Sequence, residues 1–257
     1  MKFTRDILAR IFAIWAILFF VITMIIVFIP ILVSLLFPDP LKTRIFHRIS
    51  QVWMGIFLPL SGVWLTRKGK EHFKKGESYI VICNHNTFMD VPVTTPFIPG
   101  ANKTIAKSEI KKVPVFGIIY RIGSVLVDRK SEESRKESYM KMKKVLEMGL
   151  HMCIYPEGTR NKTNEPLQRF HDGAFRLAVE TGRPIMPLVL FNTKKILPNN
   201  RFLYYWPGKI KMHFLEPVEV NGQRADVLKE KCFQIMLKHL NKYSNAEHAG
   251  DSQSPQR

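Results

Sequence analysis

The sequence has few cysteines and few acidic residues for its length of 257 residues. Its three cysteines, Cys83, Cys153 and Cys232, form an odd and widely spaced set, which excludes a disulfide framework and a cysteine-based zinc module and indicates a reducing compartment. Asp and Glu number 21 against 39 Lys and Arg, a net charge of +18. We therefore expect anionic partners, namely a membrane surface, nucleic acid or phosphorylated substrates. The hydrophobic share of 46% excludes a disordered basic protein.

Several motifs of familiar chemistries are also missing. The chain has no G-x-S-x-G nucleophile elbow, no P-loop, no G-x-G-x-x-G and no H-E-x-x-H, which argues against a covalent serine mechanism and against nucleotide hydrolysis. The histidines show no metal-ligand spacing, so we expect no metal. No nucleic-acid-binding motif accompanies the basic residues, so we expect no nucleic-acid partner.

Ionisable side chains are absent from Ile11 to Pro38, a run long enough to cross a bilayer as a helix. Basic residues flank the run on both sides, so the positive-inside rule does not choose an orientation. These residues are Lys2, Arg5, Arg10, Lys42, Arg44 and Arg48. Pro30 interrupts the run, and two membrane arrangements stay open: a spanning helix, or a re-entrant hairpin that returns both ends to the cytoplasmic side. The alternative to both is a core helix of a soluble protein.

An amphipathic segment follows the apolar run. Its apolar side chains recur at helical spacing, and they are Ile49, Val52, Trp53, Ile56, Phe57 and Leu60. Polar residues lie on and before its first turn, namely Arg44, His47, Arg48 and Gln51. The pattern predicts a helix in the headgroup layer, with inserted aromatics and with cations facing anionic lipid. A helix packed on the domain core is the alternative. We expect residues 1–65 to form a two-helix membrane motif.

Short apolar runs alternate with helical patterns from residue 66 onward. The expected strands are Tyr79–Cys83, Thr104–Ala106, Ser124–Val127, Met152–Tyr155, Ile185–Leu190 and Ile210–Leu215. The expected helices are Met89–Phe97, Val115–Ile122, Ser134–Met148, Asp172–Thr181 and Ala225–Tyr243. This alternation predicts an α/β domain over residues 66–243, with a mainly parallel mixed sheet flanked by helices and active groups after the strand ends. Residues 244–257 lack periodicity and are expected to be a disordered tail.

A histidine and an aspartate follow the first of these strands, as His85 and Asp90. Five residues turn a helix by about 500°, and an odd offset in a strand puts side chains on opposite faces. The two side chains therefore meet only if the backbone changes conformation between them, as at a strand-to-helix junction. An ionised Asp there would fix the imidazole tautomer and make His85 a general base. Without a serine partner, the nucleophile must be a hydroxyl of the substrate. Alternatively, Thr87 and Asp90 form a T-x-x-D capping box with a purely architectural role.

Cationic side chains follow other expected strands. Arg160 ends the segment Tyr155–Arg160, and Lys107 and Arg129 end two further strands. The carboxyl ends of parallel strands meet at one edge of a sheet, so these cations are expected to surround one dianion such as a phosphate. Taken singly, each is better explained as a solvated surface charge. Glu157 repels phosphate and is compatible with orienting Arg160 instead.

These segments carry a resemblance to a known family. Asn84-His85-x4-Asp90, Gly123–Arg129, Pro156–Arg160 and Pro184–Pro187 occur in the order and spacing of the four motifs of glycerolipid acyltransferases. The chain most resembles the 1-acylglycerol-3-phosphate (lysophosphatidate) acyltransferases, over residues 79–190. The resemblance implies acyl transfer from acyl-CoA or acyl-carrier protein, as co-substrate rather than cofactor, to the sn-2 hydroxyl of lysophosphatidate. The product is phosphatidate.

The same resemblance assigns roles to residues. It makes His85 the base and Asp90 its partner, with no acyl-enzyme. It assigns the phosphorylated acceptor to Glu157, Gly158, Thr159, Arg160, Arg129 and Lys107, and it places Pro187 near the acyl or acceptor pocket. Thr87 and Asn161 stand where the family commonly has Ser.

Alternatives to this reading are an acyltransferase for glycerol 3-phosphate or another lysophospholipid, and a non-catalytic, membrane-anchored protein that binds anionic lipid. The expected partners are membrane lipids, lysophosphatidate and the acyl donor. The expected location is the membrane, with the α/β domain on its cytoplasmic face.

Overall fold

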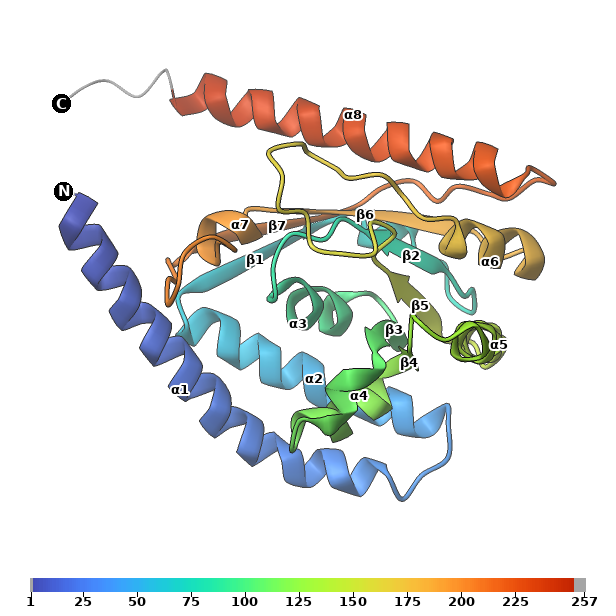
Figure 1. The fold of residues 1–257 in the computed structure, drawn as a ribbon, viewed down its shortest axis with the longest axis horizontal. Helices are drawn as coiled ribbons and strands as arrows, with labels where there is room; N and C mark the ends of the chain where they lie inside the picture. The colour runs from blue at the N-terminus through green and yellow to red at the C-terminus, as the bar shows by residue number, and fades with distance from the viewer. Residues whose placement is uncertain (1, 252–257) are drawn as a thin grey trace.

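A seven-stranded sheet separates two layers of helices in the computed structural model, which describes residues 2–251, with side chains from residue 3 to 243 (Figure 1). The strands are β1 (Val63–Lys68), β2 (Ile80–Cys83), β3 (Asn102–Lys107), β4 (Ser124–Val127), β5 (His151–Ile154), β6 (Ile185–Phe191) and β7 (Gly208–Phe214). Their order is β1-β7-β6-β2-β5-β3-β4. Neighbouring strands are parallel except β6 and β7. The predicted mainly parallel mixed sheet is therefore confirmed.

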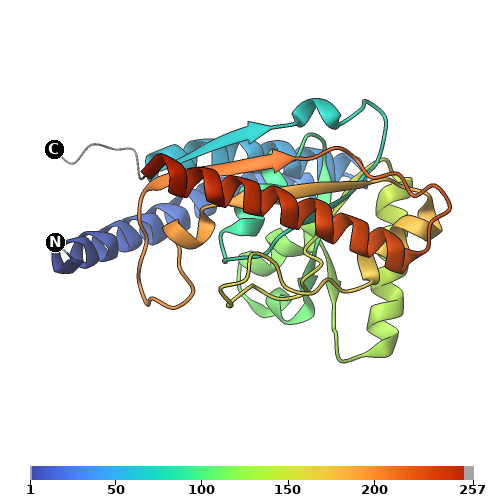
Figure 2. The ribbon, with the colours of Figure 1, turned by 90° about the horizontal axis from the view of Figure 1, so that it is seen from above.

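Helices cover both faces of the sheet, which is why β2, β5 and β6 are buried and apolar along their lengths. The longer helices are α1 (Lys2–Ser34), α2 (Leu41–Leu60), α4 (Phe116–Gly123), α5 (Glu132–Glu147), α6 (Gly173–Thr181) and α8 (Ala225–Asp251). Short elements are α3 (Asp90–Thr94), α7 (Thr193–Ile196) and the 3-10 turns η1 (Lys70–His72), η2 (Thr95–Phe97) and η3 (Ser108–Lys112). One core packs α1 to α4 on one face, and a second core packs α5, α6 and α8 on the other (Figures 1 and 2).

The N-terminal apolar run forms one continuous helix. α1 passes through Pro30 without ending, and the chain reverses at residues 35–40, so α2 returns alongside α1 (Figure 1). A turn at Pro30, on which the re-entrant arrangement depended, is therefore wrong, and the chain reverses only after the end of α1. Among the described residues α1 is one helix long and apolar enough to cross a membrane, with a mean hydropathy of 3.2 and only 11% of its most apolar window buried.

The second helix lies between α1 and the sheet rather than entirely at an outer surface. Trp53 and Phe57 are buried in the core, whereas Val52 and Ile56 of the same predicted stripe are exposed. His47, expected among the polar outward positions, is buried as well. The apolar surface of α2 is wider than the stripe alone, since Met54 is also buried. The sequence pattern could not distinguish a lipid-facing stripe from one covered by α1.

Both ends of α1 are fastened to the α/β domain. Beyond the C-terminal end, the Asp39 carboxylate lies 3.1 Å from Nζ of Lys103 on β3 and accepts a 2.5 Å hydrogen bond from Thr43. Burial alone would raise the pKa of Asp39, but these partners lower it below its usual value. At the N-terminal end, Asp6 pairs with Arg201 at 3.0 Å. The helix therefore lies along the domain.

Two expected boundaries are corrected. β1 begins at Val63 and pairs with β7, so the α/β domain starts inside the segment 1–65 expected to be the membrane motif. α8 extends to Asp251 and takes in the first part of the expected disordered tail. Residues 252–257 lie outside the described residues.

Candidate active site

The His85 and Asp90 side chains meet at the carboxyl end of β2. Nδ1 of His85 lies 2.8 Å from Oδ2 of Asp90. His85 is in the loop after the strand and Asp90 is the first residue of α3, so the backbone makes the strand-to-helix change that contact requires. Asp90 is completely buried, whereas the His85 side chain is 19% exposed.

Asp90 has an architectural role as well. Its Oδ2 accepts hydrogen bonds from the backbone N–H of Asn86 at 2.5 Å and of Thr87 at 2.7 Å, and the Thr87 hydroxyl accepts in turn from Met89 N–H at 3.3 Å. The capping interaction and the contact with His85 therefore coexist. Because a carboxylate oxygen only accepts, Nδ1 of His85 carries the proton and Nε2 keeps its lone pair. This is the tautomer that a general base requires.

Glu157 clamps the backbone of His85. Its Oε1 accepts from the His85 N–H at 2.7 Å and its Oε2 from the Gln168 N–H at 3.0 Å. The His85 carbonyl accepts from the Asn161 N–H at 2.7 Å. Glu157 is 2% exposed, and burial raises its pKa while the two N–H donors and His85 oppose that rise. The carboxylate therefore positions the His85 loop, and orientation of Arg160, the alternative derived from the sequence, is not what its hydrogen bonds do.

Two neighbours of His85 escaped the sequence analysis. The ring of Tyr155 lies 4.4 Å from the imidazole, centroid to centroid, and its hydroxyl lies 2.5 Å from the Thr94 hydroxyl. The Asn84 amide exchanges two hydrogen bonds with the backbone of Leu190, at 2.8 and 2.9 Å. Tyr155 packs against the imidazole of His85, and Asn84 attaches the His85 loop to β6. A tyrosine that ends a strand and an asparagine beside a histidine are too common to signal these roles.

The expected cations lie at one edge of the sheet. Lys107 ends β3, and Arg129 and Arg160 follow the carboxyl ends of β4 and β5; these strands are parallel and stand in the order β2-β5-β3-β4. Arg129 donates to the carbonyl of Gly158, so two of the predicted motifs touch. Arg160 stacks over the ring of Phe88, with its guanidinium carbon 3.5 Å from the ring centroid. Lys107 is exposed, and no direct contact joins it to the other two.

The remaining predicted site residues differ in position. Gly158 has φ of +69°, and a Cβ there would lie 2.7 Å from the His171 ring, so the tight turn requires glycine. Thr159 is exposed at the tip of the same loop. Pro187 is buried within β6 and paired with Ile82, and it lies outside the lining of the cavity described next. Its expected place near the acyl or acceptor pocket stays a prediction.

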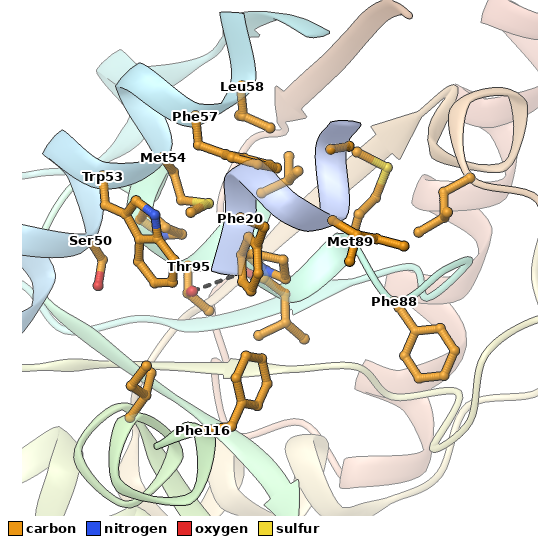
Figure 3. A pocket seen from close by; sticks show the side chains of 18 of the residues that line it. Phe20, Ser50, Trp53, Met54, Phe57, Leu58, Phe88, Met89, Thr95 and Phe116 are labelled. Atoms are coloured by element: carbon orange, nitrogen blue, oxygen red, sulfur yellow. Dashed lines mark hydrogen bonds between the residues drawn. The ribbon is translucent and has the colours of Figure 1, made fainter. Parts of the chain in front are cut away.

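An apolar cavity of about 650 Å³ opens beside the His85–Asp90 pair (Figure 3). Phe88 and Met89, which lie between the two residues in sequence, form part of its wall, and α1, α2, α3 and α4 supply the rest. Figure 3 shows Phe20 of α1, with Trp53 and Phe57 of α2, around this space. Small residues of α1 leave room there, since Ala13 and Ala16 face the cavity. The described residues contain no cluster of metal-ligating side chains.

Comparisons with known proteins agree with this arrangement. A sequence model of the acyltransferase family matches residues 65–191, which span β1 to β6 and contain His85, Asp90 and Arg160. The chain is similar to the 1-acyl-sn-glycerol-3-phosphate acyltransferase of Haemophilus influenzae, with 28% identity over 73% of this chain and 79% of that protein. The enzyme of the same name from Cocos nucifera is 30% identical over 68% of this chain and 55% of its own.

The chain thus spans most of the bacterial relative but about half of the plant relatives, including 52% of a chloroplastic enzyme from Arabidopsis thaliana. Among solved structures, the crystal structure of the 1-acyl-sn-glycerophosphate acyltransferase from Thermotoga maritima superposes with a TM-score of 0.74. The match covers 95% of this chain and 98% of that one at 21% identity. At this identity the similarity concerns the fold, including α1 and α2.

Proposed function

The chain belongs to the acyltransferase family that includes the 1-acyl-sn-glycerol-3-phosphate acyltransferases, and from this premise we propose that it transfers an acyl chain from a thioester donor to the sn-2 hydroxyl of lysophosphatidate. The product is phosphatidate, and the donor is acyl-CoA or acyl-carrier protein. The observation that carries the proposal is the buried Asp90 carboxylate 2.8 Å from Nδ1 of His85, beside an apolar cavity.

The reaction needs one base and no enzyme nucleophile. Nε2 of His85 takes the proton from the acceptor hydroxyl as that oxygen attacks the thioester carbon, and the C–S bond then breaks. The departing thiolate receives the proton back from the imidazolium. Asp90 stabilises that imidazolium through Nδ1, and burial of the carboxylate strengthens the interaction. No side chain is acylated, which agrees with the buried Cys83 and Cys153, whose pKa values are raised by burial.

The cationic side chains at the carboxyl edge of the sheet are suited to bind the phosphate of the acceptor. Arg160, Arg129 and Lys107 follow three adjacent strand ends, and a guanidinium grips phosphate through two parallel hydrogen bonds. Arg160 is held by its stack on Phe88, next to His85. A phosphate bound there brings the glycerol hydroxyl to the imidazole, while the cavity among α1 to α4 accommodates an acyl chain.

The attachment of α1 at both ends supports a one-sided membrane placement. A helix that spans a bilayer leaves its ends on opposite sides, yet Asp6 and Asp39 both pair with the α/β domain. We therefore place α1 along the interface, with exposed residues such as Ile22, Ile25 and Ile26 in the acyl region. The basic flanks and the reduced cysteines favour the cytoplasmic face.

Release of free thiol from acyl-CoA or acyl-carrier protein, on addition of lysophosphatidate to the full chain in detergent, tests the proposal. We expect thiol release and phosphatidate formation in equal amounts, with both lost in His85→Ala. Competing acceptors, glycerol 3-phosphate and other lysophospholipids, are supplied in the same assay. If one of them is acylated faster than lysophosphatidate, that compound is the acceptor instead. Lipid binding without thiol release would refute the proposed acyltransferase activity.

A further inference from the structure

The segment between α7 and β7 is rich in aromatic residues and lies beside α1. Residues 199–206, here called the aromatic loop, read Asn-Asn-Arg-Phe-Leu-Tyr-Tyr-Trp. The loop projects from the body of the molecule as the orange segment near residue 200 (Figure 2). Phe202 is 93% exposed, more than any other large apolar side chain among the described residues.

A single exposed phenylalanine is ordinary on a protein surface, but this one continues an apolar surface. The backbone N–H of Tyr205 donates to the Ala9 carbonyl of α1 at 3.2 Å. Trp206 packs edge-on against Phe12 at 6.1 Å between ring centroids, and the Arg5 guanidinium lies over the Trp206 ring at 4.9 Å from its centroid. The aromatic loop is therefore packed against the N-terminal part of α1.

The composition of the loop suits the region where headgroups meet acyl chains. Tyr and Trp are concentrated at that level in membrane proteins, and Arg extends its charge toward lipid phosphates. Arg201 lies over the ring of Tyr204 at 4.8 Å and pairs with Asp6 at 3.0 Å. Its guanidinium is thus held beside Tyr204 and Asp6, next in sequence to the exposed Phe202.

The loop also connects the proposed membrane surface with the catalytic pair. Nδ2 of Asn199 donates to the carbonyl of Asn86 at 2.5 Å, one residue from His85. Phe202, Leu203, Tyr204 and Tyr205 line the apolar cavity, as does Phe88, which is 72% exposed. The cavity lining therefore includes two exposed phenylalanines.

From these contacts we infer that the aromatic loop is a second membrane contact, which inserts Phe202 into the leaflet and seats the cavity mouth on the lipid surface. The inference rests on the proposed membrane placement of α1. A lipid acceptor then passes from the leaflet into the cavity between the loop and Phe88 without crossing water.

Single-cysteine labelling of the full chain tests the position of the loop independently of activity. Cys83, Cys153 and Cys232 are fully buried, so an environment-sensitive fluorophore on the folded protein reacts with an introduced, exposed cysteine. Three variants are compared on vesicles of phosphatidylcholine and phosphatidylglycerol: Phe202→Cys in the loop, Ile26→Cys on α1 and Val227→Cys on α8. Both comparison sites are apolar and more than half exposed.

We expect the label at 202 to shift to the blue and to be quenched by lipid-attached quenchers, as at 26, while the label at 227 behaves as in water. If the label at position 202 behaves like the label at position 227 while the label at position 26 responds to lipid, the inference about the aromatic loop is wrong and the placement of α1 still holds. No response at 26 or 202 would overturn both. In a second measurement, Phe202→Ser should lower the ratio of kcat/KM on vesicle-embedded acceptor to that on monomeric short-chain acceptor by about tenfold. Val227→Ser should leave the ratio unchanged, and an unchanged ratio in Phe202→Ser would count against the inference.

Discussion

Replacement of Glu157 by Gln separates a positioning role from a substrate-binding role. The amide keeps the shape of the carboxylate but replaces one acceptor oxygen with an N–H₂ group. Both oxygens of Glu157 accept from a backbone N–H, of His85 at 2.7 Å and of Gln168 at 3.0 Å, so the amide must present a donor to another donor. A hydrogen bond to a charged group contributes about 1.5–3 kcal/mol. The clamp on the His85 loop therefore loses one of its two charged contacts.

We expect the hydrogen bond lost in Glu157→Gln to lower the catalytic rate more than the stability of the fold. Burial raises the pKa of Glu157, so the ionised carboxylate is itself penalised in place, and a neutral amide removes that penalty. The melting temperature should change little. A displacement of the base approaching 1 Å costs about 10²-fold in rate, so we expect kcat to fall between about 10-fold and 100-fold, with the KM for lysophosphatidate nearly constant.

Steady-state thiol release with varied acceptor measures both constants, and Glu165→Gln, an exposed carboxylate in the same loop, is the matched control. A variant with a raised KM for the acceptor and a normal kcat would refute the positioning of the His85 loop by Glu157. It would instead support the direct acceptor contact that the family resemblance implies for Glu157.

Four further substitutions test other parts of the site and the fold. His85→Ala should lose at least about 10²–10⁴-fold in kcat, measured by thiol release, since it removes the base; a variant that keeps its activity would contradict the mechanism. Arg160→Ala should raise the acceptor KM by about 10-fold to 100-fold through lost charged hydrogen bonds to phosphate, with a smaller change in kcat; an unchanged KM would remove Arg160 from the phosphate site. Ala16→Phe should lower the kcat/KM of long-chain relative to short-chain acyl donors by filling the cavity, and equal losses for all chain lengths would show that the chain binds elsewhere. Burial holds the pKa of His151 at about 4, below its ordinary 6.5, so the unfolded chain gains a proton first on acidification and up to about 3 kcal/mol of stability is lost as the pH falls from 6.5 to 4. His151→Gln should flatten the dependence of the melting temperature on pH over that range, and an unchanged slope would contradict the assignment.

The central strands and the contact between His85 and Asp90 were predictable for physical reasons. β2, β5 and β6 are buried on both faces, so they read as continuous apolar runs, and β4 was predicted with its observed bounds at Ser124–Val127. The His85–Asp90 offset forced a change of backbone conformation between the two residues, which the structure shows. β1 escaped prediction because Trp64 is exposed and Thr66 to Lys68 are polar, so this edge strand shows no long apolar run.

Long-range contacts account for what the sequence analysis missed. Glu157 reaches the backbone of a residue 72 positions away, and backbone groups carry no sequence signal. The position of α2 beneath α1 depended on which helix covers which stripe, and hydrophobic periodicity alone does not contain that information.

The ion pair between Asp39 and Lys103 joins the turn after α1 to β3, the strand that adjoins β5 in the sheet. With the pairing of Asp6 and Arg201 at the other end, it holds α1 against the α/β domain at both ends. On the proposed membrane placement of α1, the imidazole of His85 then keeps one distance from the lipid surface. A lysolipid acceptor would have to raise its hydroxyl to that level, so the length of its headgroup would decide which lipids reach the proposed base.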